Sequence, residues 1–210
     1  MAKIILIRHG ETEWNRADIF RGRIDVELNE TGIEQAELLG EYLCDRDIEA
    51  IYSSPLKRAL RTAQAIAGRY RLDVQTNSGL IDMNLGEWEG LSRPAVAEKY
   101  KEVYNLWMTS PEKVTIPGGE RLAEVRKRAV ALIDEVRARH KGTVVLVSHR
   151  VICKVLTCAL LGLDDSHFWN IEQGNCGMTT FLYEKGQFIL TEHNNTSFLK
   201  LLRKKPLGDF

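Results

Sequence analysis

The 210-residue chain has little of what marks a membrane, secreted or disulfide-stabilised protein. No apolar stretch approaches the roughly 18 uninterrupted residues that a membrane-spanning helix needs, and the first residues lack the pattern of a signal peptide. Only four cysteines occur, at positions 44, 153, 158 and 176, and two of them lie in an apolar helical pattern. Such sparse cysteines favour buried, reduced thiols over a disulfide framework. We therefore expect a cytoplasmic protein with no membrane partner.

The chain also lacks an excess of charge of either sign. It has 29 Lys and Arg against 29 Asp and Glu, so its formal net charge is 0. A surface built for nucleic acid would be strongly basic, so no nucleic-acid partner is expected, and any anion-binding site must be local. The sequence contains no P-loop, no G-x-G-x-x-G, no H-E-x-x-H and no paired C-x-x-C. We expect neither a metal nor another cofactor.

Short apolar runs rich in β-branched residues alternate with amphipathic helical patterns along the chain. Strands are predicted at residues 3–7, 50–54, 73–76 and 143–147, with a β-hairpin at 178–183 and 188–192. Helices are predicted at residues 31–45, with Thr31 as N-cap, and at 56–70, 94–108, 121–140 (closed by Gly142) and 151–161. From Phe198 the chain is predicted to end in a frayed, basic tail.

This alternation predicts an α/β protein: a three-layer α/β/α sandwich with a mostly parallel sheet and an antiparallel edge strand. No low-complexity linker or internal repeat divides the chain, so residues 1–210 are predicted to form a single domain. Residues 91–120 are predicted to be an insertion or lid within it.

Two of the predicted strands end in histidine. Arg8 and His9 follow the first strand, and Ser148 and His149 follow the strand near residue 145. Ligands of parallel sheets bind outside the carboxyl ends of the strands, so both imidazoles converge on one site if these strands are neighbours. Arg58 lies near the start of a helix at the same edge. Two histidines with two arginines suit a compact dianion such as a phosphoryl group.

Taken singly, each of these residues carries little weight, because a lone histidine at a strand end is often structural and an arginine at a helix start often faces solvent. Together with their surroundings, however, they resemble the histidine phosphatase superfamily, also called the phosphoglycerate mutase-like family. The resemblance covers nearly the whole chain and rests on segments that occur in the family's order: 6–15 (LIRHGETEWN), 20–25 (FRGRID), 28–32 (LNETG), 53–58 (SSPLKR), 86–90 (GEWEG), 117–120 (PGGE) and 147–149 (VSH).

The resemblance implies that His9 is a nucleophile that forms a phosphohistidine. It implies that Arg8, Arg58 and His149 bind the phosphoryl oxygens and stabilise the charge that develops on them. The phosphate-binding and substrate-binding set that it implies also includes Gly10, Asn15 and Gly22. Attack requires a neutral imidazole, and nearby arginines are expected to lower the pKa of His9.

One departure from the family pattern concerns the general acid that protonates the leaving alkoxide. The family has a glutamate four residues before the glycine of the G-x-W motif, and here that position is Asp82. Aspartate is one methylene shorter, and a misplacement of about 1 Å can reduce a rate by on the order of 100-fold. We nevertheless predict Asp82 as the acid, with its apolar neighbours favouring the protonated form. Glu87 and Glu89 are the fallback candidates, although a structural role in the turn is favoured for both.

Two further departures add positive charge. Arg21 stands where the family often has glutamine, and Arg150 stands where it often has glycine. We interpret both as substrate-binding residues for a second anionic group, such as a carboxylate or another phosphate. The alternative is that both side chains face solvent or pair with Asp25 or Glu27.

The function predicted is therefore hydrolysis of a phosphomonoester, with a small phosphorylated metabolite as substrate. A cofactor-dependent phosphoglycerate mutase is an alternative, but family mutases have longer segments around the substrate than residues 91–120 provide. A catalytically weak homologue that binds a phosphorylated ligand as a sensor is a third hypothesis, raised by the shorter Asp82. A homodimer is compatible with the family pattern, although nothing in the sequence specifies it.

Overall fold

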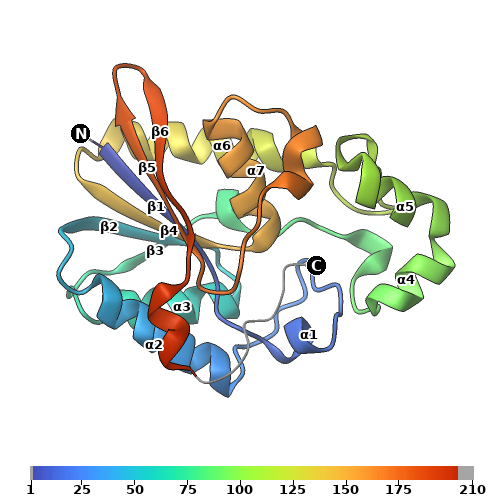
Figure 1. Cartoon of the computed structure of the whole chain (residues 1–210), viewed down its shortest axis with the longest axis horizontal. Helices are drawn as coiled ribbons and strands as arrows, with labels where there is room; N and C mark the ends of the chain where they lie inside the picture. The colour runs from blue at the N-terminus through green and yellow to red at the C-terminus, as the bar shows by residue number, and fades with distance from the viewer. Residues whose placement is uncertain (1, 203–210) are drawn as a thin grey trace.

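A computed structural model describes residues 2–202 as helices packed on both faces of a six-stranded sheet (Figure 1). The strand order is β3-β2-β4-β1-β5-β6. The strands are β1 (Ala2–Arg8), β2 (Ile48–Ser53), β3 (Val74–Thr76), β4 (Thr143–Ser148), β5 (Met178–Glu184) and β6 (Gln187–Asn195). The first four are parallel, whereas β5 runs antiparallel to β1 and β6 antiparallel to β5.

Seven α-helices and five short 3-10 helices connect the strands within residues 2–202. The α-helices are α1 (Glu13–Arg16), α2 (Glu30–Leu43), α3 (Lys57–Ala67), α4 (Arg93–Lys99), α5 (Lys101–Thr109), α6 (Leu122–Arg139) and α7 (Arg150–Leu160). The 3-10 helices are η1 (Ser78–Leu80), η2 (Gly86–Trp88), η3 (Pro111–Lys113), η4 (Asp165–Asn170) and η5 (Ser197–Leu201).

The central strands are apolar on both faces, which is typical of parallel strands covered by helices on two sides. Ile5 and Ile7 of β1 pack against α2 and α3, whereas Ile4 and Leu6 pack in the core that α6 and α7 form on the other face. All four side chains are at most 2% exposed. The predicted three-layer fold with an antiparallel edge is confirmed.

The order of the strands decides where the site lies. Strand β4 pairs with β1 in parallel, and Arg8 lies opposite Ser148 in the register. The residues that follow these strands, His9 and His149, therefore leave the same edge of the sheet side by side. The His9 backbone N–H donates to the Ser148 carbonyl over 2.9 Å, which extends the pairing one residue beyond the strands.

The segment predicted as an insertion or lid, residues 91–120, contains α4, α5 and η3 and lies to the right of the sheet in Figure 1. Its core side chains Val96, Trp107 and Val114 pack with Trp88 and Phe168 beside the α6 and α7 layer. The role of a lid stays a prediction. The single helix expected at 94–108 is wrong, because Tyr100 leaves helical geometry (φ −120°, ψ 40°) between α4 and α5.

Three further details differ from the sequence prediction. The N-cap of α2 is Asn29 rather than Thr31, since the Asn29 side chain accepts the Gly32 N–H over 2.8 Å. Helix α6 ends at an extended His140 (φ −117°) and not through Gly142, whose N–H donates to Glu49. The predicted tail begins as the 3-10 helix η5, and the part beyond residue 202 lies outside the described residues.

All four cysteines are free thiols. Burial raises the pKa of Cys158 to about 11 and that of Cys176 to about 12. Within residues 2–202, no helix combines the length and the apolar character that crossing a membrane requires.

Candidate active site

The two histidines expected to converge do so at the carboxyl end of the sheet. The ring centroids of His9 and His149 lie 5.2 Å apart with the planes at 61°, and the two residues are 1% and 0% exposed. His9 follows β1, and His149 is the N-cap residue of α7 directly after β4. Neighbouring strands of one sheet therefore hold both imidazoles, which fixes their separation.

The ring of His9 is oriented by its own loop. Its Nδ1 lies 2.6 Å from the Gly10 carbonyl oxygen, which can only accept, so Nδ1 carries the proton and Nε2 keeps its lone pair. Burial lowers the pKa of His9 well below its ordinary value, and the charges of Arg58, Arg8 and Arg21 lower it further. The predicted direction is confirmed, although burial contributes more than the arginines. His9 is thus a neutral imidazole with a nucleophilic nitrogen.

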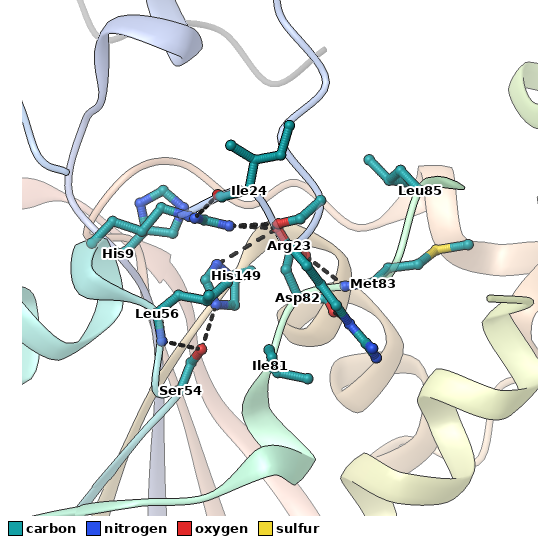
Figure 2. Close-up of polar contacts among 12 residues, drawn as sticks. His9, Arg23, Ile24, Ser54, Leu56, Ile81, Asp82, Met83, Leu85 and His149 are labelled. Atoms are coloured by element: carbon teal, nitrogen blue, oxygen red, sulfur yellow. Dashed lines mark hydrogen bonds and ion pairs between the residues drawn. The ribbon is translucent and has the colours of Figure 1, made fainter. Parts of the chain in front are cut away.

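His149 is oriented by Ser54, the residue that directly follows β2. The distance from His149 Nε2 to Ser54 Oγ is 2.8 Å, and Ser54 Oγ also accepts the Leu56 N–H over 3.3 Å (Figure 2). The serine proton is therefore free to point at Nε2, which leaves the His149 proton on Nδ1, toward Asp82. Burial lowers the pKa of His149 well below its ordinary value, and Arg58 and His9 act in the same direction.

Two arginines are fixed by backbone carbonyls next to these rings. Arg58, in the first turn of α3, is 0% exposed, and it donates from Nη1 to Ile24 O over 2.9 Å and from Nη2 to Gly22 O over 2.8 Å. Arg8 is 3% exposed and donates from Nη1 to Gln173 O over 2.7 Å. Burial lowers the pKa of Arg58, while the Asp82 charge opposes this shift.

Arg21 faces the cluster and does not turn to solvent. It is 9% exposed, and its Nε and Nη1 atoms are buried with no hydrogen-bond partner among the residues that the structure describes. Its alternative partners are engaged elsewhere, since Asp25 accepts the Lys57 N–H and Glu27 pairs with the Lys57 ammonium. Burial lowers the pKa of Arg21 well below its ordinary value, and the Arg8 and Arg58 charges add to this.

Arg150 lies at the border of the same cluster, at the start of α7. Its guanidinium carbon is 5.8 Å from the centre of the Trp169 ring, and its charge lowers the pKa of Arg21. The aromatic wall behind it, which contains Trp107 and Phe168, belongs to the hydrophobic core. Arg150 thus lies close enough to Arg21 for its charge to act there, and its role in substrate binding stays a prediction.

Asp82 reaches the site from the loop after η1. Its Oδ2 lies 3.2 Å from Arg58 Nη2 and 3.6 Å from His149 Nδ1, and its Oδ1 accepts the Met83 N–H over 3.0 Å (Figure 2). The carboxylate is therefore next to the residues predicted to bind phosphate, although it faces cations and not the apolar neighbours that were expected to keep it protonated.

The remaining predicted residues lie around the same centre. Asn15 is 2% exposed, and its Nδ2 has no hydrogen-bond partner within residues 2–202. Gly10 contacts α2 so closely that a Cβ would lie 2.5 Å from the Gly32 carbonyl oxygen. Gly22 has φ +50°, the left-handed region that favours glycine. Each glycine thus permits a backbone course that positions His9 or Arg58.

The two fallback acids have structural contacts. Glu89 Oε1 accepts the N–H groups of Arg23 and Leu85 over 2.9 and 3.0 Å, which ties two loops together. Glu87 Oε2 accepts the Tyr100 hydroxyl over 2.7 Å. Both contacts agree with the structural role that the sequence favours for them.

Sequence reasoning missed four polar residues that support the site. Ser54 orients His149, and Thr62 Oγ1 accepts the Gly10 N–H over 3.1 Å while it donates to Arg58 O. Asn175 Nδ2 donates to His9 O over 3.1 Å, and the Gln173 carbonyl binds Arg8. Ser54 lies in the segment 53–58 that resembles the family. Gln173 and Asn175 follow no recognisable pattern, and only the tertiary structure brings them to the site.

The site offers cations and donors and lacks a metal-binding set. The described part of the chain contains no cluster of three or more His, Cys, Asp and Glu side chains that could hold a metal ion. What the arrangement provides is a neutral histidine with guanidinium groups and a second imidazole around it, next to one carboxyl group. These are the requirements of phosphoryl transfer through a covalent histidine intermediate.

Comparison with known proteins agrees with this chemistry. Residues 4–196 match the family described as Histidine phosphatase superfamily (branch 1). Phosphoserine phosphatase 1 of Hydrogenobacter thermophilus is 40% identical over 200 residues, which cover 95% of each chain. The chain belongs to the histidine phosphatase superfamily, and the predicted phosphomonoester-hydrolysing class is confirmed.

Solved structures show the same fold. The structure named Bacillus stearothermophilus YhfR has a TM-score of 0.91 at 28% identity and covers 95% of this chain and 100% of its own. A phosphoserine phosphatase mutant from Entamoeba histolytica, in complex with phosphoserine, has a TM-score of 0.86 at 34% identity, with coverage of 95% and 100%. The same enzyme has also been solved with 3-phosphoglyceric acid.

Proposed function

We propose that this protein hydrolyses small phosphorylated carboxylic acids, such as phosphoserine or a phosphoglycerate, through a phosphohistidine at His9 and without a metal ion. The observation that carries the proposal is the state of His9, whose Nδ1 proton is held by Gly10 O while the charges of Arg58, Arg8 and Arg21 act on its buried ring. The neutral Nε2 of His9 and the surrounding positive charge together favour attack on the phosphorus of a dianionic phosphoryl group.

The first half of the reaction transfers the phosphoryl group to the protein. His9 Nε2 forms a bond to phosphorus, the phosphorus–oxygen bond of the ester breaks, and Asp82 gives its proton to the leaving oxygen. Arg8, Arg58 and His149 stabilise the charge on the other phosphoryl oxygens. Asn15 Nδ2 supplies a neutral donor, since it is buried and lacks a partner among the described residues.

The second half returns the enzyme to its starting state. Water attacks phosphorus, the bond to His9 Nε2 breaks, and Asp82 takes the proton that the water loses. The products are the alcohol and inorganic phosphate, so no cofactor is consumed. Microscopic reversibility requires the same carboxyl group to act as acid and then as base.

The substrate's second anionic group is assigned to Arg21. Buried guanidinium donors without partners are unfavourable, so an arriving anion that pairs with Arg21 Nε and Nη1 gains free energy. Arg150 adds positive charge on the same side. Phosphoserine and 3-phosphoglyceric acid, bound by the Entamoeba histolytica relative, both carry a carboxylate near the phosphate.

Trapping tests the nucleophile. Phosphoserine labelled in its phosphate is mixed with the protein, the reaction is stopped in alkali, and the label is located by mass spectrometry. We expect an acid-labile label on His9 and none in His9→Gln. A protein that hydrolyses the substrate with no label on His9 would contradict the mechanism, and label passed to added phosphoglycerate instead of water would favour a mutase.

Leaving-group dependence tests the acid. Asp82→Asn is expected to lower kcat for phosphoserine strongly and kcat for para-nitrophenyl phosphate little, because the nitrophenolate leaves without a proton. Glu87→Gln is the matched control, since Glu87 contacts Tyr100 and not the site. Loss of phosphoserine hydrolysis in Glu87→Gln with none in Asp82→Asn would refute the assignment. No turnover of either substrate by the unmodified protein would favour a sensor.

Substrate preference tests Arg21. Arg21→Gln is expected to raise KM for phosphoserine about 10-fold, the value of one charge-assisted hydrogen bond, and to leave KM for para-nitrophenyl phosphate unchanged. Lys57→Gln removes an exposed charge that pairs with Glu27, and it serves as the control. An equal rise in KM for both substrates would place Arg21 on the phosphoryl group instead.

Three assignments accompany the enzyme proposal. A cytoplasmic location is favoured by three buried cysteines that are free thiols. A homodimer and a lid function for residues 91–120 stay predictions, which solution scattering with and without phosphate can test.

A further inference from the structure

The carboxylate of Asp82 occupies part of the surface of Arg58 that a phosphoryl group would use. Arg58 Nη2 has two protons, and it donates to two acceptors, Gly22 O at 2.8 Å and Asp82 Oδ2 at 3.2 Å. Nη1 is directed at Ile24 O, and the buried Nε has no partner among residues 2–202. A phosphate that binds the Nε and Nη2 edge of Arg58 in bidentate fashion therefore needs the proton that Asp82 holds.

The same carboxylate oxygen also faces the second phosphate-binding residue. Asp82 Oδ2 is 3.6 Å from His149 Nδ1, an atom that is buried and forms no hydrogen bond within the described residues (Figure 2). One oxygen thus stands between a guanidinium and an imidazole that both act on the phosphoryl group in the mechanism above.

Cationic side chains from several elements surround this carboxylate, and one imidazole approaches it. Arg58 from α3 is in contact, Arg21 acts on it from the loop before α2, and His149 approaches from the start of α7. Arg23 and Arg128 donate to the Asp82 backbone carbonyl over 3.4 and 3.1 Å. Without a ligand, the carboxylate is therefore a counter-ion of the cluster.

We infer that Asp82 is an internal competitor of the phosphoryl group, and that the incoming dianion displaces it from Arg58 and His149 and thereby loads it with a proton. The displaced carboxylate loses its cationic partner and meets the negative phosphoryl oxygens, so it binds a proton from solvent. On the proposed function, this is the proton that the leaving oxygen receives. When phosphate departs, the carboxylate returns to Arg58 and releases a proton, which speeds product release.

Calorimetry with inorganic phosphate tests this inference without any turnover. Phosphate is titrated into the unmodified protein and into Asp82→Asn, in two buffers with different enthalpies of ionisation, so that the affinity and the number of protons bound are both obtained. We expect Asp82→Asn to bind phosphate about 10-fold more tightly, because a neutral amide competes weakly for Arg58. The unmodified protein is expected to bind more protons on complex formation than Asp82→Asn does.

Asp25→Asn is the matched control. The Asp25 charge acts on Arg58, but its carboxylate accepts the Lys57 N–H over 2.8 Å and does not contact Arg58 Nη2. Its affinity for phosphate is expected to change less than 3-fold and its proton count not at all. A similar gain in phosphate affinity in Asp25→Asn would show that the effect comes from charge alone, and it would overturn the inference.

Unchanged or weaker phosphate binding by Asp82→Asn, or equal proton binding by both proteins, would also overturn it. The proton count of the unmodified protein needs no variant, so it decides the matter even if Asp82→Asn does not fold. Failure of the His9 trapping experiment refutes the proposed function and leaves these binding data unaffected, so the two failures are distinguishable.

Discussion

The buried histidine pair makes the stability of the protein depend on pH in a window where most proteins are stable. His9 and His149 are both buried, and burial is the largest cause of the lowered pKa of each. Unfolded histidine has a pKa of about 6.5. Below that pH the unfolded chain binds two protons that the folded chain does not, so the free energy of unfolding falls as the pH falls.

The magnitude follows from this linkage. Each neutral histidine contributes stability that is fully present above the unfolded pKa and is lost at about 1.4 kcal/mol per pH unit below it. Between about pH 7.5 and pH 5.0, each histidine whose folded pKa stays below that range removes about 2 kcal/mol, and the pair removes about 4 kcal/mol. Such a loss is a large part of the free energy of unfolding of a typical domain, which is about 5–15 kcal/mol.

Urea unfolding at a series of pH values, in buffers without phosphate, measures the slope of the free energy of unfolding against pH. Replacing His149 by Asn changes the stability at every pH, but only the slope tests the reasoning. The slope should fall by about half in His149→Asn and nearly vanish in the double variant with His9→Asn. Desolvation also lowers the pKa of His193, so this residue adds a smaller slope of the same sign. A flat profile in the unmodified protein, or an unchanged slope in the double variant, would refute the argument.

Two further substitutions test the supports of the site. Ser54→Ala removes the hydrogen-bond partner of His149 Nε2. We expect kcat/KM to fall about 10-fold and the nitrogen-15 spectrum of the His149 ring to show mixed tautomers, and we expect Ser54→Thr to restore both. An unchanged tautomer in Ser54→Ala would contradict the role of Ser54. Gly10→Ala places a Cβ 2.5 Å from the Gly32 carbonyl. It should lower the free energy of unfolding by about 1–3 kcal/mol, while Gly68→Ala, whose Cβ would lie 3.5 Å from the nearest atom, should not, and equal values would refute the steric argument.

The sequence predicts the parts of the fold that local physical chemistry determines. Residues 144–147 are all apolar because helices cover both faces of β4, and this uninterrupted run is enough to predict the strand. The convergence of His9 and His149 followed from the general rule on strand ends, once β1 and β4 were neighbours. The first of these features needs no knowledge of distant contacts, whereas the second also depends on the pairing of β1 with β4.

Other features depend on contacts that no local pattern contains. The break at Tyr100 has no glycine or proline nearby; its ring packs 6.4 Å from Trp88, and its hydroxyl binds Glu87. At the start of α2, Asn29 and Thr31 are both good caps, and Asn29 is chosen because its side chain also donates to Glu11, from the loop after β1. Tertiary contacts decided both cases.

The arginine cluster explains why the surroundings of the Asp82 carboxylate could not be predicted from its neighbours in sequence. Leu80 and Met83 flank Asp82, and they suggest a carboxyl group kept neutral by apolar surroundings. The structure buries these two side chains in the core and directs the carboxylate to Arg58. Apolar neighbours in the sequence show that the backbone passes the core. The side chain between them can still point away from the core, toward charged groups.

The same arrangement settles how so much positive charge is kept together without a ligand. Burial is the largest cause of the lowered pKa values of Arg21 and His9, and repulsion from the neighbouring arginines adds to it. Backbone carbonyls hold Arg8 and Arg58 in place, so their orientation is fixed before substrate arrives. One carboxylate, Asp82, offsets part of the repulsion, and a phosphoryl dianion brings twice its charge. On the inference above, the substrate therefore binds by exchange with an existing anion, because the phosphoryl group takes the place of Asp82 beside Arg58.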